Sequence, residues 1–138
     1  MGLYLRIITP MRTAVDAEVS GVLVPSMQGE MEVLPGHADI IAAIDNGELV
    51  YREIGKEPHS IFIGGGFLQV DKELALIVTD TVLEADEIDA SSVEEAVARA
   101  QETFRNQSSV LSREEQTHLA AAIARQLAML EYRNKKRK

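Results

Sequence analysis

The sequence contains no cysteine and no tryptophan, and only 4% of its 138 residues are aromatic. Without cysteine the chain forms no disulfide and no thiolate metal site, and it has no thiol nucleophile, as is typical of a reducing compartment. The hydrophobic residues, 46% of the chain, must therefore build an aliphatic core. No segment resembles a secretory signal or approaches the roughly eighteen apolar residues of a membrane span. We expect a globular protein without direct membrane insertion.

Negative charge predominates, with a formal net charge of -8 at pH 7. Such a surface repels phosphate backbones, so we expect no nucleic-acid partner. Residues 1–85 hold 5 basic and 13 acidic side chains, whereas residues 86–138 hold 9 of each. Five cations gather at the end of the chain: Arg133, Lys135, Lys136, Arg137 and Lys138. This pattern fits either a solvated tail or a positive tip that docks on an acidic surface.

The first part of the chain, residues 1–86, has the pattern of many short strands. Its apolar runs are short, rich in β-branched residues and separated by turn-forming residues. Predicted strands cover residues 4–8, 18–24, 32–34, 40–44, 48–52, 60–63, 67–70 and 74–78. Asn46-Gly47 is expected to supply the positive φ of a tight hairpin turn. Turns at about ten-residue spacing predict an antiparallel β-sandwich or barrel.

The second part, residues 87–138, has a helical pattern. Glycine and proline are both absent after Val70, while alanine and glutamate are abundant. One helix is predicted from Ser92 to Arg105, with Ser92 and Glu95 as a capping box; a second follows Ser112 and Glu115 and reaches Tyr132. The two should pack as an antiparallel hairpin, giving an α+β protein. Because its apolar stripes are thin and alanine-rich, we expect this hairpin to open readily.

Motifs that would carry chemistry are scarce. The histidines, His37, His59 and His118, are not spaced as metal ligands, and no nucleophile motif occurs, so we expect neither a metal site nor an active site. The Gly64-Gly65-Gly66 run is followed by a predicted strand instead of the Lys-Ser/Thr and helix of a phosphate loop. A bend or bulge is therefore the better interpretation of these glycines.

Several motifs, in a fixed order, resemble the epsilon subunit of F-type ATP synthases. The stretch GEMEVLPGHA at residues 29–38 is similar to the family's G-E-x-x-x-L-P-G-H-A motif. It is followed by GGFLQV at residues 65–70, VTDT at residues 78–81 and EID at residues 87–89, which opens the predicted helical tail. The resemblance covers essentially the whole chain.

The resemblance implies a non-catalytic subunit of the rotating central stalk, without a cofactor, that couples the gamma subunit to the c-ring during ion-driven ATP synthesis. It implies a peripheral position on the cytoplasmic face of a bacterial plasma membrane. Residues expected at the c-ring and gamma interface are Gln28, Gly29, Glu30, Met31, Glu32 and His37. Glu30 is the first choice for contact with the polar loops of the c-ring, and the His37 turn is expected near the same face. His37 has an equally weighted alternative role, which is to brace its own Pro-Gly turn.

The family's helical tail can fold beside the sandwich or extend along gamma towards the catalytic alpha and beta subunits, where it impedes hydrolysis. About 40 helical residues at 1.5 Å each would span roughly 60 Å. Residues expected to serve this regulation are Arg125, Arg133, Lys135, Lys136, Arg137 and Lys138. All of these except Arg125 would suit an acidic patch on the catalytic subunits.

Some members of the family bind ATP through an I/L-D-x-x-R-A motif in the folded tail, and this chain departs from it. Ile88 and Asp89 match, but Ser92 and Val93 replace the arginine and the alanine. Losing the guanidinium removes the group best suited to phosphate, so we expect negligible ATP affinity. Two alternatives remain open at this point: a nucleotide-sensing regulator, and an unrelated β-sandwich adaptor.

Overall fold

The computed structural model describes residues 2–107 and 109–136, so Arg137 and Lys138 of the predicted basic tip lie outside the described residues. The chain divides into two compact units, Met1–Glu84 and Ala85–Lys138. The boundary predicted from the sequence, after residue 86, lies two residues further along. Each unit is considered by itself.

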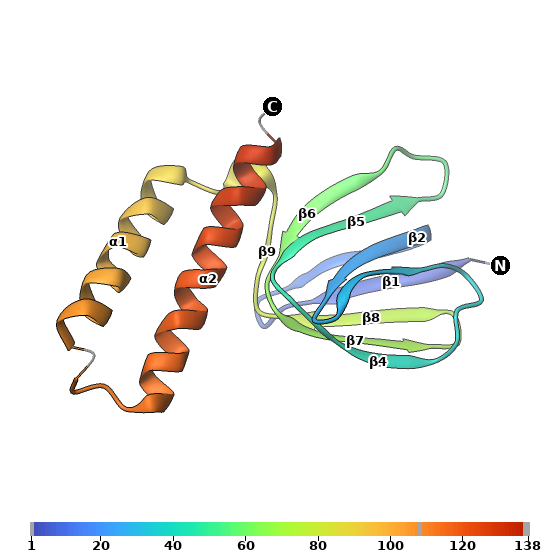
Figure 1. Cartoon of the computed structure of the whole chain (residues 1–138). Coiled ribbons are helices and arrows are strands. Elements are labelled where there is room, and N and C mark those ends of the chain that lie inside the picture. Colours follow the sequence, from blue (N-terminus) through green and yellow to red (C-terminus); the bar gives the residue numbers. More distant parts are fainter. Residues whose placement is uncertain (1, 108, 137–138) are drawn as a thin grey trace. The chain divides into compact units, whose positions relative to one another are not determined.

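The first unit is a β-sandwich built from strands, most of which are labelled in Figure 1. Within the described residues they are β1 (Leu3–Ile8), β2 (Thr13–Ser26), β3 (Gly29–Val33), β4 (Ile40–Ile44), β5 (Gly47–Glu53), β6 (His59–Ile63), β7 (Gly66–Asp71), β8 (Leu74–Thr79) and β9 (Val82–Leu83). All eight predicted strands are present, each within a few residues of its predicted bounds except β2, which is twice as long. The short β9, which pairs with β6, was not predicted.

β2 joins the two layers of the sandwich. Its first part pairs with β1, its second part pairs with β3 and β5, and Ser26 near its end is paired with Ile44 of β4. The hydrogen-bonded order is therefore β1-β8-β7-β4-β2-β5-β6-β9, with β3 attached to β2. Figure 1 shows β1, β8, β7 and β4 in one layer and β5 and β6 in the other. The sandwich is antiparallel as predicted, apart from β1 and β8, which run parallel.

The core between the layers is aliphatic. Alternate residues of β1, Leu3, Leu5 and Ile7, are at most 1% exposed, and the other strands contribute further leucine, isoleucine and valine side chains to the same cluster. This alternation is the period of two that a strand imposes on its side chains. The expectation of an aliphatic core is confirmed.

The prediction of a hairpin turn at Asn46-Gly47 is wrong. Gly47 does not have a positive φ, and β4 and β5 are not paired with each other, since β4 pairs with β7 and β5 pairs with β6. The segment instead crosses from one layer to the other. The Oδ1 atom of Asn46 accepts a hydrogen bond of 3.0 Å from the backbone N–H of Gly65. This bond links the β4–β5 connection to the connection between β6 and β7.

The glycine run is a bend, as predicted. Gly64 and Gly65 connect β6 to β7, which belong to different layers. The buried hydroxyl of Thr79 lies 3.0 Å from the carbonyl oxygen of Gly64 and 3.1 Å from that of Gly65, and the Gly64 N–H donates to the Thr81 carbonyl at 2.9 Å. These backbone groups are thus satisfied within the protein, and the run does not form a phosphate loop.

The second unit begins with a 3₁₀ turn, η1 (Ala85–Glu87), and continues as the helices α1 (Ala90–Gln107) and α2 (Arg113–Lys136). The capping box predicted at Ser112 and Glu115 is confirmed: the Ser112 N–H donates to Glu115 at 3.0 Å and the Glu115 N–H donates to the Ser112 hydroxyl at 3.1 Å. The box predicted at Ser92 and Glu95 is wrong, because Asp89 caps α1 and the helix starts two residues earlier than predicted.

Candidate functional site

The outward side of β4, β7 and β8 forms an exposed apolar face. Ile41 on β4, Phe67 on β7 and Val78 on β8 are 72%, 63% and 50% exposed. Phe67 is paired in register with Ala43 on one side and Val78 on the other, so these side chains form a continuous row. We call Ile41, Ala43, Phe67 and Val78 the apolar face. A contiguous exposed apolar surface is a candidate interaction site.

The sequence analysis missed the apolar face, although a signal for it was present. A strand with one solvated side alternates apolar and polar residues. β4 reads IIAAI and β8 reads LALIVT, so both strands carry apolar residues on their outward positions as well as their inward ones. That departure from alternation indicates a covered outer side.

The predicted interface residues lie on the β2–β3 hairpin and along β3. Ser26 fixes the turn: its hydroxyl donates to the Gly29 carbonyl at 2.5 Å and accepts the Gln28 N–H at 3.2 Å. Gly29 has a φ of 114°, a conformation that favours glycine. Met27 at the tip is 64% exposed. The hairpin therefore presents an ordered loop to its surroundings.

The charged residues of this hairpin point outward. Glu30 and Glu32 are both exposed and, two positions apart on β3, lie on the same side of the strand. Gln28 and Gly29 are also exposed, whereas Met31 is half-buried against the core. Of the predicted set, Met31 thus contributes to packing, and the two carboxylates are available to a partner.

His37 belongs to a separate turn at the other end of β3. Its N–H donates to the Leu34 carbonyl at 3.0 Å, and Gly36 has a φ of 84°. The ring Nδ1 atom lies 2.7 Å from the Ala38 carbonyl oxygen, which accepts but cannot donate, so Nδ1 carries the proton. The geometry supports the bracing role. Since β3 separates this turn from Gly29 by about 14 Å of strand, the structure does not bring His37 to the hairpin tip.

The residues of the partial ATP motif form the start of α1. Ile88 and Val93 are buried. The Asp89 carboxylate accepts hydrogen bonds from the hydroxyl of Ser92 at 3.1 Å and from the backbone N–H of Ser91 at 3.0 Å. Ser92, which stands where the motif has arginine, therefore donates to Asp89 and completes a helix cap. The arrangement stabilises the helix and places no cation from α1 beside Asp89.

The cations of the tail have different surroundings. The Nε–H of Arg133 donates to the Ile88 carbonyl at 2.9 Å, and Arg133 is half-buried. The Lys136 ammonium lies 5.9 Å from the centre of the buried Tyr132 ring, within cation–π range. Arg125 is half-buried, and Lys135 is exposed. The described cations at this end of α2 therefore do not form one uniform positive tip, because Arg133 and Lys136 contact other groups of the helical unit.

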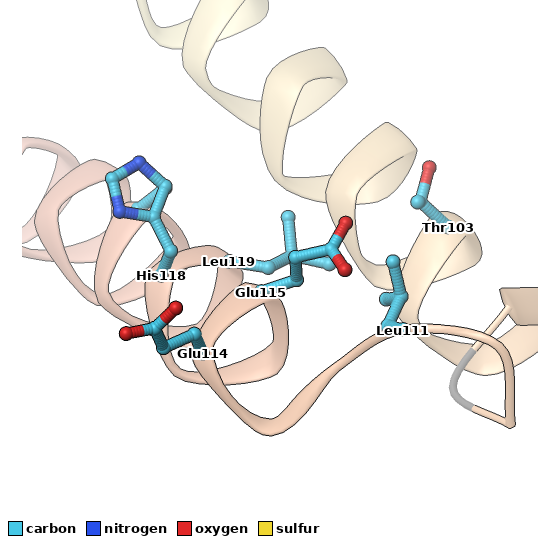
Figure 2. Close-up of a pocket in the computed structure, with 7 residues that line it drawn as sticks. Thr103, Leu111, Glu114, Glu115, His118 and Leu119 are labelled. Carbon is cyan, nitrogen blue, oxygen red and sulfur yellow. The ribbon is translucent and has the colours of Figure 1, made fainter.

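An open groove of about 670 Å³ lies between α1 and α2 near their connection (Figure 2). Thr103, Leu111, Leu119 and Ala122 line it together with acidic residues of the first turn of α2. Figure 2 shows Leu111 and Leu119 pointing towards α1, with Glu114 and His118 further out. The sequence did not predict this groove. The groove is open to solvent and lies where the two helices approach their connection.

Two further findings concern sites of other kinds. Within residues 2–107 and 109–136, no three histidine, aspartate or glutamate side chains cluster so as to hold a metal ion. His59 instead lies with its Nε2 atom 3.0 Å from Glu84 Oε2. Neither α1 nor α2, as far as the structure describes them, is apolar over a length that could cross a membrane.

Acid should unwind the helical unit. Hydrogen bonds from the Ser92 hydroxyl and backbone lower the pKa of Asp89 from 3.8, and bonds from the Ser112 N–H and hydroxyl lower the pKa of Glu115 from 4.5. A carboxyl whose pKa is lowered by folding stabilises the fold above its ordinary pKa and loses that contribution as pH falls through the lowered value. We expect helicity, measured by circular dichroism, to fall as the pH is lowered below about 4.5.

The matched variant for this experiment combines Asp89→Ala with Glu115→Gln. Because it lacks both titrating caps, it should start with less helix at pH 7 and lose less of it on acidification. Equal acid losses in the variant and the parent would contradict the assignment of the effect to these two carboxylates.

Comparison with known proteins gives consistent results. A sequence model of the ATP synthase Delta/Epsilon chain β-sandwich domain matches residues 2–85. An ATP synthase epsilon chain of Dehalococcoides mccartyi is 35% identical over 135 residues, which cover 96% of this chain and 95% of the relative. That of Ruthia magnifica is 30% identical over 133 residues, covering 96% and 94%.

Solved structures share the fold. A chain in the cryo-EM structure of the Euglena gracilis mitochondrial ATP synthase superimposes with a TM-score of 0.74 at 21% identity, covering 93% of this chain and 79% of that one. A chain in the central stalk and c-ring structure of the Tetrahymena thermophila enzyme gives a TM-score of 0.65 at 8% identity, with coverage of 100% and 98%.

Proposed function

We propose, since the chain belongs to the family of ATP synthase epsilon chains, that it is a central-stalk subunit that couples gamma to the c-ring and has no active site of its own. The apolar face is the observation that carries this proposal. Phe67 and Ile41 are more than half exposed, so covering them with a partner buries apolar surface, which is favourable. Because they lie on strands that are already ordered, little backbone conformational entropy is lost on binding. The natural partner for such a surface is another subunit.

Gamma is assigned to the apolar face because this surface suits a permanent contact. Permanent interfaces are more apolar than transient ones and are centred on large side chains such as Phe67. The c-ring is assigned to the β2–β3 hairpin, where Glu30 and Glu32 project together beside the exposed Met27. A rigid, charged loop suits contact with polar loops, where complementary charge sets orientation.

The helical unit is assigned a regulatory role, in which it opens, extends along gamma and impedes ATP hydrolysis. Its packing supports mobility: Phe104 on α1 and Leu127 on α2 are 37% and 46% exposed. The bacterial relatives support a peripheral position on the cytoplasmic face of the plasma membrane.

Deleting residues 112–138 tests this function. If the tail impedes hydrolysis, the assembled complex carrying the truncated chain should hydrolyse ATP several-fold faster than the complex with the full chain, since an obstructing state is removed. Binding to gamma should be unchanged, which an assembly assay by gel filtration would check. An unchanged hydrolysis rate in a fully assembled complex would leave only the coupling role.

ATP should not bind appreciably to the free chain. Ser92 supplies a neutral hydroxyl that is already bonded to Asp89, in place of a guanidinium fork. Isothermal titration calorimetry with ATP and magnesium is expected to give no heat of binding at micromolar concentrations. Ser92→Arg, which restores the motif at this position, is the informative comparison. Low-micromolar binding by the unmodified chain would favour the nucleotide-sensing alternative.

A further inference from the structure

α2 is longer than α1, and its last turns contact a different part of the unit. The helices have 24 and 18 residues, so in an antiparallel hairpin the C-terminal end of α2 extends beyond the start of α1. That end packs against η1, Ala85–Glu87, which precedes α1. The two ends of the helical unit, far apart in sequence, therefore meet in the closed hairpin.

Arg133 makes the hydrogen bond that joins these ends. Its Nε–H donates to the Ile88 carbonyl at 2.9 Å, across 45 residues of sequence. The Ile88 carbonyl directly precedes the capping residue Asp89, and the positive charge of Arg133 contributes to the lowered pKa of that carboxyl. One guanidinium thus interacts with a backbone carbonyl and with the carboxylate that caps α1. Hydrogen bonds from a charged donor are about twice as strong as neutral ones.

We propose that Arg133 is a latch that holds the hairpin closed and must leave the Ile88 carbonyl before the hairpin opens. This inference rests on the proposed function, in which the tail moves. It changes the role of one of the cations assigned to partner binding, because an Nε–H that donates to Ile88 is not available to an acidic surface. A carboxylate-rich partner surface therefore competes with Ile88 for Arg133, and engaging it favours the open state.

Because few residues of the hairpin are buried, a single contact at its end can determine whether the hairpin is open or closed. An open groove lies between α1 and α2 near their connection (Figure 2), and Phe104 and Leu127 retain substantial exposure. In α1 and α2, as far as the structure describes them, only Val93, Val97 and Tyr132 are buried, although most helical stability in proteins comes from packing of an apolar face. In a balance of this kind, losing one charge-assisted hydrogen bond changes the ratio of open to closed molecules by about tenfold.

The absence of cysteine allows a direct measurement of opening. Ala98→Cys on α1 and Ala124→Cys on α2, both at exposed positions, give two unique labelling sites in the full chain. Spin labels at these sites report the distance between the helices by pulsed electron paramagnetic resonance. Arg133→Gln should raise the ratio of long to short distances about tenfold over the parent, with circular dichroism confirming that both helices persist.

Arg105→Gln is the matched control, since it removes one positive charge from an exposed position near the other end of the hairpin. It should change the ratio less than twofold. Arg133→Lys, which keeps the charge but loses the guanidinium Nε–H, should give an intermediate value. If Arg133→Gln gives the same distances as the parent, or if Arg105→Gln opens the hairpin equally, the latch is refuted.

The latch and the inhibitory role can fail separately. If Arg133→Gln opens the hairpin in the free chain but leaves hydrolysis by the assembled complex unchanged, Arg133 is a latch and the tail is not an inhibitor. If the free chain stays closed while truncation of the tail still accelerates hydrolysis, the tail inhibits and the latch is wrong.

Discussion

Phe67→Glu is expected to lower the affinity of the chain for gamma at least about a hundredfold. Phe67 lies at the middle of the apolar row, between Ala43 and Val78, and is 63% exposed in the free chain. Truncating a central interface residue costs about 3 kcal/mol, which corresponds to roughly a hundredfold, and a buried unpaired carboxylate adds to that cost. Surface plasmon resonance with immobilised gamma would measure the change.

The fold should survive Phe67→Glu, because the side chain points away from the core. Ile54→Glu is the matched control: Ile54 is 57% exposed, yet lies in the connection between β5 and β6, outside the apolar face. It introduces the same charge and should leave gamma affinity within about twofold, since surface substitutions away from a contact have small effects. Equal losses in both variants would mean that the apolar face is not the gamma site.

Gly66→Ala is expected to have the largest effect on stability. A Cβ atom at Gly66 would overlap the carbonyl oxygen of Val78 and lie 3.0 Å from its carbonyl carbon and 3.1 Å from the Cα of Thr79. These are backbone atoms of the paired strand β8, which cannot rotate away as a side chain would. We expect a loss of at least about 3 kcal/mol in the free energy of unfolding, measured with urea.

Gly65→Ala provides the graded comparison. Its Cβ atom would stand 3.3 Å from the Ile44 carbonyl oxygen, a contact that a small shift relieves. The expected cost is about 1 kcal/mol. A loss at Gly65 as large as that at Gly66 would indicate that backbone freedom, and not the close approach of β7 to β8, explains why glycine occupies this run.

Local patterns predicted the elements well and their connections less well. The eight strands and the Ser112–Glu115 box depend on neighbouring residues, so their signals are contained in short windows of sequence. Asn46-Gly47 has the composition of a hairpin turn. The strands on either side of it instead pair elsewhere, β4 with β7 and β5 with β6, and its Asn46 side chain accepts a hydrogen bond from Gly65, nineteen residues away. No local pattern carries that information.

For the same reason, the sequence indicated the charged residues of the candidate interface but not its apolar face. Glu30 and Glu32 belong to the motif at residues 29–38 and lie two positions apart, and the structure exposes both. The row formed by Ala43, Phe67 and Val78 comes from three strands, and its existence depends on their register. The bond from Arg133 to Ile88 likewise depends on the extra length of α2. Sequence indicated the residue types, and only the fold indicated which ones meet.

The parallel pairing of β1 with β8 also bears on how the chain folds. Tyr4 is paired with Leu74, so the first strand stays unpaired on one edge until the chain has been synthesised nearly to the end of the sandwich. Contacts separated so widely in sequence slow folding, typically to milliseconds or seconds, whereas helical hairpins fold in microseconds to milliseconds. The helical unit, although translated after the sandwich, can therefore acquire its structure first.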